Sequence, residues 1–303
     1  MELRDIEYFA VIAERGHLGR AAEALGLSQP ALSKSLRRLE QSMQTKLVKR
    51  TPKGVELTPE GSALLAHVQQ LRLSLGDVVR EVADLGQGRA GHLRIGAGTG
   101  LVEYLLQAAC GALSKDAPKV TVTVTALGNA ALLSAVRHGE LDLIVGGIPA
   151  SPYDDLVQEY LCNDEYVVYA SADHRLAKRK RVTIADLAQE RWALSAINDL
   201  SWQWVHRAFE DSGLAPPRIM MLASSTTFRF DTVASCELVG FGSRRLLQQA
   251  ASRLRCSELR VKELTWNRRV GVSYRKNAYL SPAARRLIEI LKSTAQEISK
   301  EGK

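Results

Sequence analysis

Basic side chains are concentrated near the N-terminus of this chain. Seven lysines and arginines but only one acid, Glu40, occur between residues 28 and 54, which gives that stretch a formal charge of +6. The whole chain has 41 basic and 33 acidic residues and a net charge of +8. Cations at this density suit contacts with nucleic-acid phosphates, although a solvated basic surface is an alternative. The seven residues are Lys34, Arg37, Arg38, Lys46, Lys49, Arg50 and Lys53.

Three helices are predicted to position these residues. Apolar side chains recur at helical spacing over residues 3–13 and stop at Gly16, a typical C-terminal cap. A second short helix follows at about 18–25 and ends at Gly26. A third begins after Ser28, a favourable N-cap. Two short helices joined by a glycine turn are typical of a helix-turn-helix motif.

The polar face of the third helix is suited to reading DNA. Its predicted buried stripe is Leu32, Leu36, Leu39 and Met43. Side chains near the start of such a helix can reach base edges, and cations further along can bind phosphates. The DNA-binding candidates on this helix are Gln29, Pro30, Ser33, Lys34, Arg37 and Arg38.

A β-hairpin is predicted directly after this helix. The segment KLVKRTPKGVELTPEG has strand-like ends on either side of a turn at residues 52–54. Arg50, Thr51 and Lys53 would lie on this wing, within reach of the DNA backbone. A three-helix scaffold with a solvated basic face is the alternative. The agreement of charge, helix cap and turn favours DNA binding.

The first 61 residues resemble the winged helix-turn-helix of LysR-type transcriptional regulators. The resemblance rests on the run from FAVIAERGHLGRAAEALGLSQPALSKSLRRLE to LTPEG, which follows the family pattern almost completely. It implies three parts, namely a DNA-binding domain at 1–57, a linker helix at 58–88 and an effector domain at 89–303. The implied partners are double-stranded DNA with inverted half-sites, a small-molecule effector and a second copy of the chain, with RNA polymerase as a further candidate.

The predicted linker helix has apolar residues at alternating spacings of four and three. This heptad repeat indicates pairing with a helix of another chain, and an amphipathic helix lying on its own domain is the alternative. The resemblance implies a homodimer through antiparallel linker helices, often paired again into a homotetramer. Gly86, Gly88 and Gly91 are expected to end the helix. The dimerisation candidates are Leu64, Val68, Leu71, Leu75, Val78 and Val82.

Strands alternate with helices from residue 92 onward, which predicts an α/β fold with a parallel sheet. The resemblance implies a periplasmic-binding-protein-like effector domain with two subdomains. Subdomain I is expected at about 91–164 and 270–303, and subdomain II at about 165–269. The small-molecule site is expected between them.

Candidate effector contacts follow the predicted strands. Ligands of open parallel sheets bind beyond the carboxyl ends of strands, where helix N-termini offer free N–H groups. The resemblance also points to positions after the first and second strands, to the loop 198–202 and to the segment 224–227. Each residue could instead be only a helix cap. The candidates are Thr99, Gly100, Asn129, Ser201, Trp202 and Thr226.

The segment VASCELVGFGSRRL departs from the family pattern. Arg244 and Arg245 stand where an apolar-proline run is usual, and Cys236 replaces a small residue. Two cations near the mouth of the site would favour an anionic effector. A solvated helix N-terminus facing away from the site is the alternative.

Other classes of function receive little support from the sequence. GAGTGL at 96–101 lacks the last glycine of a dinucleotide-binding motif, and no hydrolase, zinc-protease or P-loop motif occurs. We therefore expect no enzyme activity, no cofactor and no metal site, and a DNA binder without a ligand stays open as an alternative. The four scattered cysteines predict reduced thiols, with a redox role for Cys236 left open. A cytoplasmic protein is expected, because neither a transmembrane run nor a secretory signal is recognisable.

Overall fold

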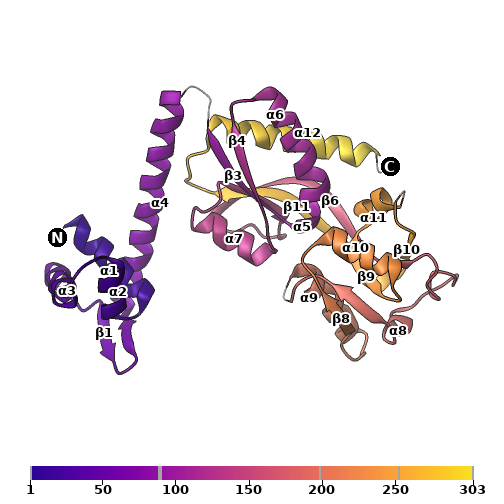
Figure 1. The fold of residues 1–303 in the computed structure, drawn as a ribbon, viewed down its shortest axis with the longest axis horizontal. Helices are drawn as coiled ribbons and strands as arrows, with labels where there is room; N and C mark the ends of the chain where they lie inside the picture. Colours follow the sequence, from indigo (N-terminus) through magenta and orange to yellow (C-terminus); the bar gives the residue numbers. More distant parts are fainter. Residues whose placement is uncertain (1, 88–90, 198, 252, 302–303) are drawn as a thin grey trace. The chain divides into compact units, whose positions relative to one another are not determined.

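The computed structural model describes residues 2–87, 91–197, 199–251 and 253–301 (Figure 1). The chain folds into two compact units, Met1–Val79 and Arg80–Lys303. Within the described residues, no helix is both long and apolar enough to cross a bilayer. The predicted class, a winged helix-turn-helix followed by an α/β domain, is confirmed.

The N-terminal unit has the predicted three helices and wing. Gly16 ends the first helix in the left-handed region at φ 62°, and the Ser28 side chain accepts a hydrogen bond from the backbone N–H of Ala31, so both predicted caps are confirmed. Strands β1 and β2 pair antiparallel around the short turn. The elements are α1 (Leu3–Arg15), α2 (Leu18–Ala24), α3 (Gln29–Met43), β1 (Val48–Thr51), β2 (Gly54–Leu57) and α4 (Pro59–Gln87).

Helix α4 begins as part of the core of this unit. Val68 is only 2% exposed, and Leu64 packs against the cluster that contains Phe9 and Leu32. The winged domain therefore covers Val68 and part of Leu64, so within this chain Val68 has almost no surface left for contact with a second chain, whereas Leu64 stays a candidate. Arg72 further ties α4 to α1 through ion pairs with Glu7 and Glu14.

The rest of the heptad stripe on α4 is exposed. Leu71, Leu75, Val78 and Val82 have between 39% and 63% of their surface accessible, and Val79 beside them has 68%. A regular row of exposed apolar side chains on one helix is costly in water. These residues stay candidates for contact with a second chain.

The second unit is built on one mixed sheet. Its strand order is β4-β3-β5-β11-β6-β9-β7-β8, and β10 pairs with β6. The predicted parallel pairing holds for β3 with β4 and β5, and for β7 with β8 and β9, whereas β6 and β11 run antiparallel to their neighbours. The strands are β3 (His92–Ala97), β4 (Thr121–Ala126), β5 (Leu143–Gly147), β6 (Leu156–Ser171), β7 (Arg191–Leu194), β8 (Arg218–Leu222), β9 (Val239–Ser243), β10 (Cys256–Leu259) and β11 (Trp266–Arg275).

Helices cover both faces of this sheet. In Figure 1, α6 and α12 lie together over one face of β3 and β4, and α7 lies over the other. The α-helices are α5 (Thr99–Leu101), α6 (Gln107–Asp116), α7 (Asn129–Arg137), α8 (Ile184–Leu187), α9 (Leu200–Asp211), α10 (Thr226–Ser235), α11 (Arg244–Ala250) and α12 (Pro282–Glu301). A π-helix (Val102–Leu106) joins α5 to α6, and a 3-10 turn (Lys262–Leu264) precedes β11.

Two long strands join the two halves of this unit. The 16-residue strand β6 pairs with β11 from Leu156 to Tyr166, and continues beside β9 and β10. The pairing slips between Val270 and Gly271, a local irregularity of the kind that bends a strand. The boundaries predicted for the subdomains, near 165 and 270, fall on these two strands.

Candidate functional site

The exposed face of α3 presents most of the predicted DNA-binding side chains together. Gln29, Pro30, Lys34 and Arg37 are exposed, and Ser33 is half-buried among them. Arg50 on β1 donates a hydrogen bond to Ser33 Oγ at 3.0 Å, so the wing and α3 form one continuous polar surface. Thr51 is half-buried and Lys53 is exposed on the same wing.

Arg38 is used differently from its neighbours on α3. Its Nε donates to Asp5 Oδ2 at 2.8 Å, and Ser35 Oγ donates to the other oxygen of the same carboxylate. Asp5 is fully buried, and the hydrogen bond from Arg38 holds the pKa of its carboxyl below its usual range. Arg38 thus compensates the charge of a buried carboxylate that joins α1 to α3, and because its side chain is half exposed, a phosphate contact stays a prediction.

The wing is anchored to the turn between α1 and α2. Val55 N donates to Gly16 O at 2.8 Å, and Gly54 has a φ of 137°. A Cβ at position 54 would lie 2.3 Å from that carbonyl oxygen, so only glycine fits. The sequence analysis missed this contact, although a glycine at the end of the hairpin turn was a visible signal.

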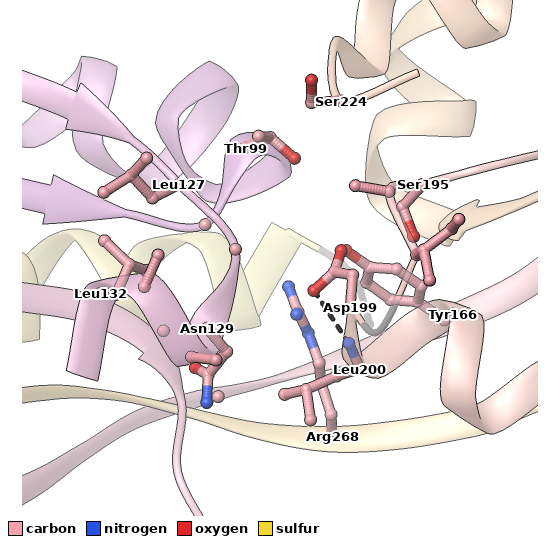
Figure 2. Close-up of a pocket in the computed structure, with 18 residues that line it drawn as sticks. Thr99, Leu127, Asn129, Leu132, Tyr166, Ser195, Asp199, Leu200, Ser224 and Arg268 are labelled. Atoms are coloured by element: carbon pink, nitrogen blue, oxygen red, sulfur yellow. Dashed lines mark hydrogen bonds between the residues drawn. The ribbon is translucent and has the colours of Figure 1, made fainter. Parts of the chain in front are cut away.

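The second candidate site is a cavity of about 230 Å³ between the two halves of the second unit (Figure 2). Thr99 and Asn129, both predicted, line it from the starts of α5 and α7. The lining residues are Gly98, Thr99, Leu127, Gly128, Asn129, Ala130, Ala131, Leu132, Gly146, Gly147, Tyr166, Ser195, Ala196, Ile197, Asp199, Leu200, Ser224 and Arg268.

Four of the predicted effector contacts are not among the residues that line the cavity, namely Gly100, Ser201, Trp202 and Thr226. Gly100 and Thr226 are buried, and the Thr226 hydroxyl donates to Thr99 Oγ1 at 3.4 Å. Ser201 is buried with its Oγ 2.6 Å from Ser195 Oγ, and the Trp202 ring stacks on His206 instead. Neither Ser201 nor Trp202 is among the residues that line the cavity, and Ser201 lies behind the lining residue Ser195. Asn198, in the same predicted loop, lies outside the described residues.

Asp199 and Arg268 are the charged side chains among these lining residues. Asp199 lies in the loop 198–202 that the sequence analysis pointed to, whereas Arg268 was not predicted. Asp199 is the N-cap of α9 and accepts a hydrogen bond from Leu200 N at 2.8 Å. Figure 2 shows its carboxylate and the Arg268 guanidinium reaching into the same space. A strand residue 169 positions after Thr99 gives no local signal of such a role.

The Arg268 side chain is held in place by a buried carboxylate. Its Nη2 pairs with Asp164 Oδ2 at 2.9 Å, Ser243 Oγ donates to Asp164 Oδ1 at 2.6 Å, and the guanidinium lies 4.4 Å from the centre of the Tyr166 ring. Burial alone would lower the pKa of Arg268, but its electrostatic interactions with Tyr166, Asp164 and Tyr104 raise the pKa instead. Arg268 is thus a fixed cation at the floor of the cavity.

Arg244 and Arg245 do not supply cations to this cavity. Arg244 forms ion pairs with Glu258 and Glu165. Arg245 donates to the carbonyl oxygen of Ile298 at 2.8 Å and lies over the Tyr104 ring. The argument that these two residues favour an anionic effector was therefore wrong, because their charges are used elsewhere.

The cysteines show no sign of a reactive pair. Burial raises the pKa of the Cys162 and Cys256 thiols to about 11 and also raises that of Cys110, while Cys236 is exposed. Across the described parts of the chain, no group of three or more metal-ligating side chains comes together.

Comparison with known proteins identifies the family. Residues 3–62 match the profile "Bacterial regulatory helix-turn-helix protein, lysR family", and residues 86–296 match "LysR substrate binding domain". The chain is 27% identical over 300 residues to the "HTH-type transcriptional regulator GbpR" of Azospirillum brasilense, which covers 97% of this chain and 87% of that protein. It is 34% identical over 223 residues to the "Small neutral protease regulatory protein" of Streptomyces coelicolor. That match covers 71% of this chain and 66% of the Streptomyces protein.

Solved structures show the same fold. That of "CbnR, a LysR family transcriptional regulator" is 19% identical, covers 97% of this chain and 99% of that chain, and has a TM-score of 0.60. A structure of full-length CbnR "complexed with the target DNA complex" is 19% identical and has a TM-score of 0.61. The match covers 97% of this chain and 100% of that chain. The chain belongs to the LysR family of DNA-binding transcriptional regulators, as the sequence analysis predicted.

Proposed function

We propose that this chain binds an operator with inverted half-sites as a homodimer that pairs further into a homotetramer. The supporting observation is the exposed cationic face of α3, joined to the wing by the bond from Arg50 to Ser33. A two-fold dimer presents two such faces and therefore fits two symmetric half-sites. RNA polymerase is a further proposed partner. The proposal places the chain in the cytoplasm and includes no catalytic step.

Substitutions on α3 and on the wing test the DNA contacts separately. With an operator selected from random DNA, Gln29→Ala is expected to relax base preference and to cost about 1–3 kcal/mol at one base pair. Arg50→Ala is expected to weaken all sequences alike and to reduce the salt slope of binding by about one. Lys119→Ala, an exposed cation of the other unit, is the control. Unchanged affinity for operator and for random DNA in both test variants would refute the assignment.

A small-molecule effector is proposed to bind in the cavity that Thr99 and Asn129 line. A ligand shifts a two-state assembly only through different affinity for the two states, so closing the cavity around it would change how the DNA-binding units are held. Thr99→Val keeps the shape and removes a hydrogen-bonding hydroxyl, and we expect it to weaken effector binding by about 1 kcal/mol.

The effector experiment begins from thermal stability. A library of small metabolites is screened for compounds that raise the melting temperature of the full chain, and each hit is titrated against Thr99→Val and Asn129→Ala. Thr123→Val, on an exposed part of β4, is the matched control. An effector whose affinity is the same in wild type and in both cavity variants would place the site elsewhere.

A further inference from the structure

We propose that the cavity binds a small zwitterion, namely an α-amino acid with an aliphatic side chain. Its carboxylate would face Arg268 and its ammonium group would face Asp199. This inference rests on the proposed function of the cavity as the effector site, and it adds the chemical class of the ligand.

The charges of the described lining carry the inference. The charged side chains among the eighteen lining residues are one arginine and one aspartate. A ligand with only negative charge would meet the Asp199 carboxylate, and a ligand with only positive charge would meet the Arg268 guanidinium. A ligand that carries one charge of each sign can pair with both side chains, and such pairing is stronger in a protein cavity than in bulk water.

Arg268 still has hydrogen-bonding capacity toward the cavity. Its side chain is 11% exposed, and its Nη2 is used by Asp164. Its buried Nε has no hydrogen-bond acceptor among the described residues. A buried donor without a partner costs free energy, and a carboxylate is the acceptor that a guanidinium binds best. The carboxylate of a ligand in the cavity would instead bind at Nη1, for which the described residues supply no hydrogen-bond acceptor either.

Asp199 retains the capacity to bind an ammonium group. One of its oxygens accepts from Leu200 N, and no cation of the described chain lies within ion-pair distance of its carboxylate. An ionised carboxylate can accept about four hydrogen bonds, so the N-cap role leaves most of its acceptor sites free. Figure 2 shows this carboxylate directed into the cavity beside Arg268.

The remaining walls set the size and polarity of the ligand. Apolar side chains line much of the cavity, and its volume of about 230 Å³ is below that of pockets for drug-sized ligands. A short aliphatic side chain fits these walls without an unpaired polar group. The apolar lining residues are Leu127, Ala130, Ala131, Leu132, Ala196, Ile197 and Leu200.

The test compares amino acids with analogues that lack one charge. Thermal shift and calorimetry on the full chain would use glycine, L-alanine, L-valine and L-leucine, each beside the carboxylic acid without the amino group and the amine without the carboxylate. At least one amino acid is expected to raise the melting temperature, and its two analogues to bind at least about tenfold more weakly. No shift with any of the four amino acids at about 10 mM would overturn the proposal.

Asp199→Asn separates the charge of Asp199 from its structural role. Asparagine is as good an N-cap as aspartate, so α9 is expected to stay folded while the negative charge is lost. The variant should lose at least about tenfold in affinity for the amino acid and gain affinity for its deaminated analogue. The control is Asp173→Asn, at an exposed aspartate of the same unit. It should leave the affinities for the amino acid and for the deaminated analogue unchanged.

Two outcomes distinguish failure of this inference from failure of the proposed site. The first is a ligand that loses affinity in Thr99→Val and Asn129→Ala but binds Asp199→Asn as tightly as wild type. That result would refute the proposal of a zwitterionic ligand and would support the cavity as the effector site. An amino acid that binds independently of Thr99, Asn129 and Asp199 would overturn both.

Discussion

Arg268 on β11 and Asp164 on β6 lie opposite each other in the strand pairing, and their side chains form an ion pair of 2.9 Å. Asp164 is almost fully buried, and Ser243 occupies its other oxygen. Since β6 and β11 are the strands that join the two halves of the unit, this pair fixes the cavity cation on the connection between the halves. The same contact therefore contributes to stability and to the chemistry of the cavity.

Removing the buried partner should destabilise this unit. Asp164→Ala leaves Arg268 as an uncompensated buried cation, and we expect a loss of about 3–5 kcal/mol in the free energy of unfolding. All four tryptophans (Trp192, Trp202, Trp204 and Trp266) lie in this unit, so their fluorescence during urea unfolding is the measurement. Asp173→Ala, which breaks an exposed pair with Arg255, is expected to cost less than about 1 kcal/mol. Equal losses in the two variants would contradict the assignment.

The exposed stripe on α4 predicts the oligomeric state. Replacing Leu71 and Leu75 together by lysine would place charges in an apolar helix contact, and the dimer is expected to dissociate while each unit stays folded. Sedimentation velocity measures the change. Gln69→Lys adds one positive charge on the opposite face of the helix and should leave the dimer intact. A double variant that sediments like wild type would exclude this stripe as the interface.

Asp5 predicts a pH dependence of the N-terminal unit. Its folded pKa is below the ordinary value of 3.8, through the hydrogen bond from Arg38. The ionised carboxylate therefore stabilises the fold above pH 3.8, and this contribution is lost as the pH falls through the lowered folded value. Hydrogen exchange of α1 and α3 should be slower in wild type than in Asp5→Asn near neutral pH, and the difference should shrink in acid. Glu2 is an exposed neighbour of Arg38, and the variant Glu2→Gln should exchange the amides of α1 and α3 at nearly the wild-type rate at either pH.

Thiol reactivity should follow burial. Cys236 is exposed, whereas burial raises the pKa values of Cys162 and Cys256 to about 11, so few thiolates form there near pH 8. Ellman's reagent is expected to label Cys236 fastest in the native chain, and Cys236→Ser should remove the fast phase. Persistence of that phase in the variant would show that a buried thiol is accessible.

Much of the fold could be predicted because its signals are local. Gly16 and Ser28 mark helix ends by conformational preference and side-chain hydrogen bonding, and both act as predicted. The heptad on α4 predicted the helix, but a repeat of apolar residues does not say which surface covers each one. Val68 is covered by its own domain and Leu75 is not, a difference that depends on how far the winged domain extends along α4.

The candidate cavity could be predicted only in part for a related reason. Thr99 and Asn129 follow parallel strands, and the rule for such positions needs no tertiary detail. Arg268 and Tyr166 come from the crossing strands, which the sequence analysis expected to be parallel. Trp202 was misplaced because its orientation depends on where α9 begins, one residue after the Asp199 cap.

The anchoring of α4 has a consequence for DNA spacing. Val68 is covered by the winged domain and Arg72 pairs with Glu7 and Glu14 of α1, so α4 is attached to the domain that carries α3 just before the exposed stripe begins. A dimer formed through Leu75 would therefore fix the distance and the angle between the α3 helices of its two chains. An operator with one extra base pair between its half-sites would then have to bend or twist to match that spacing.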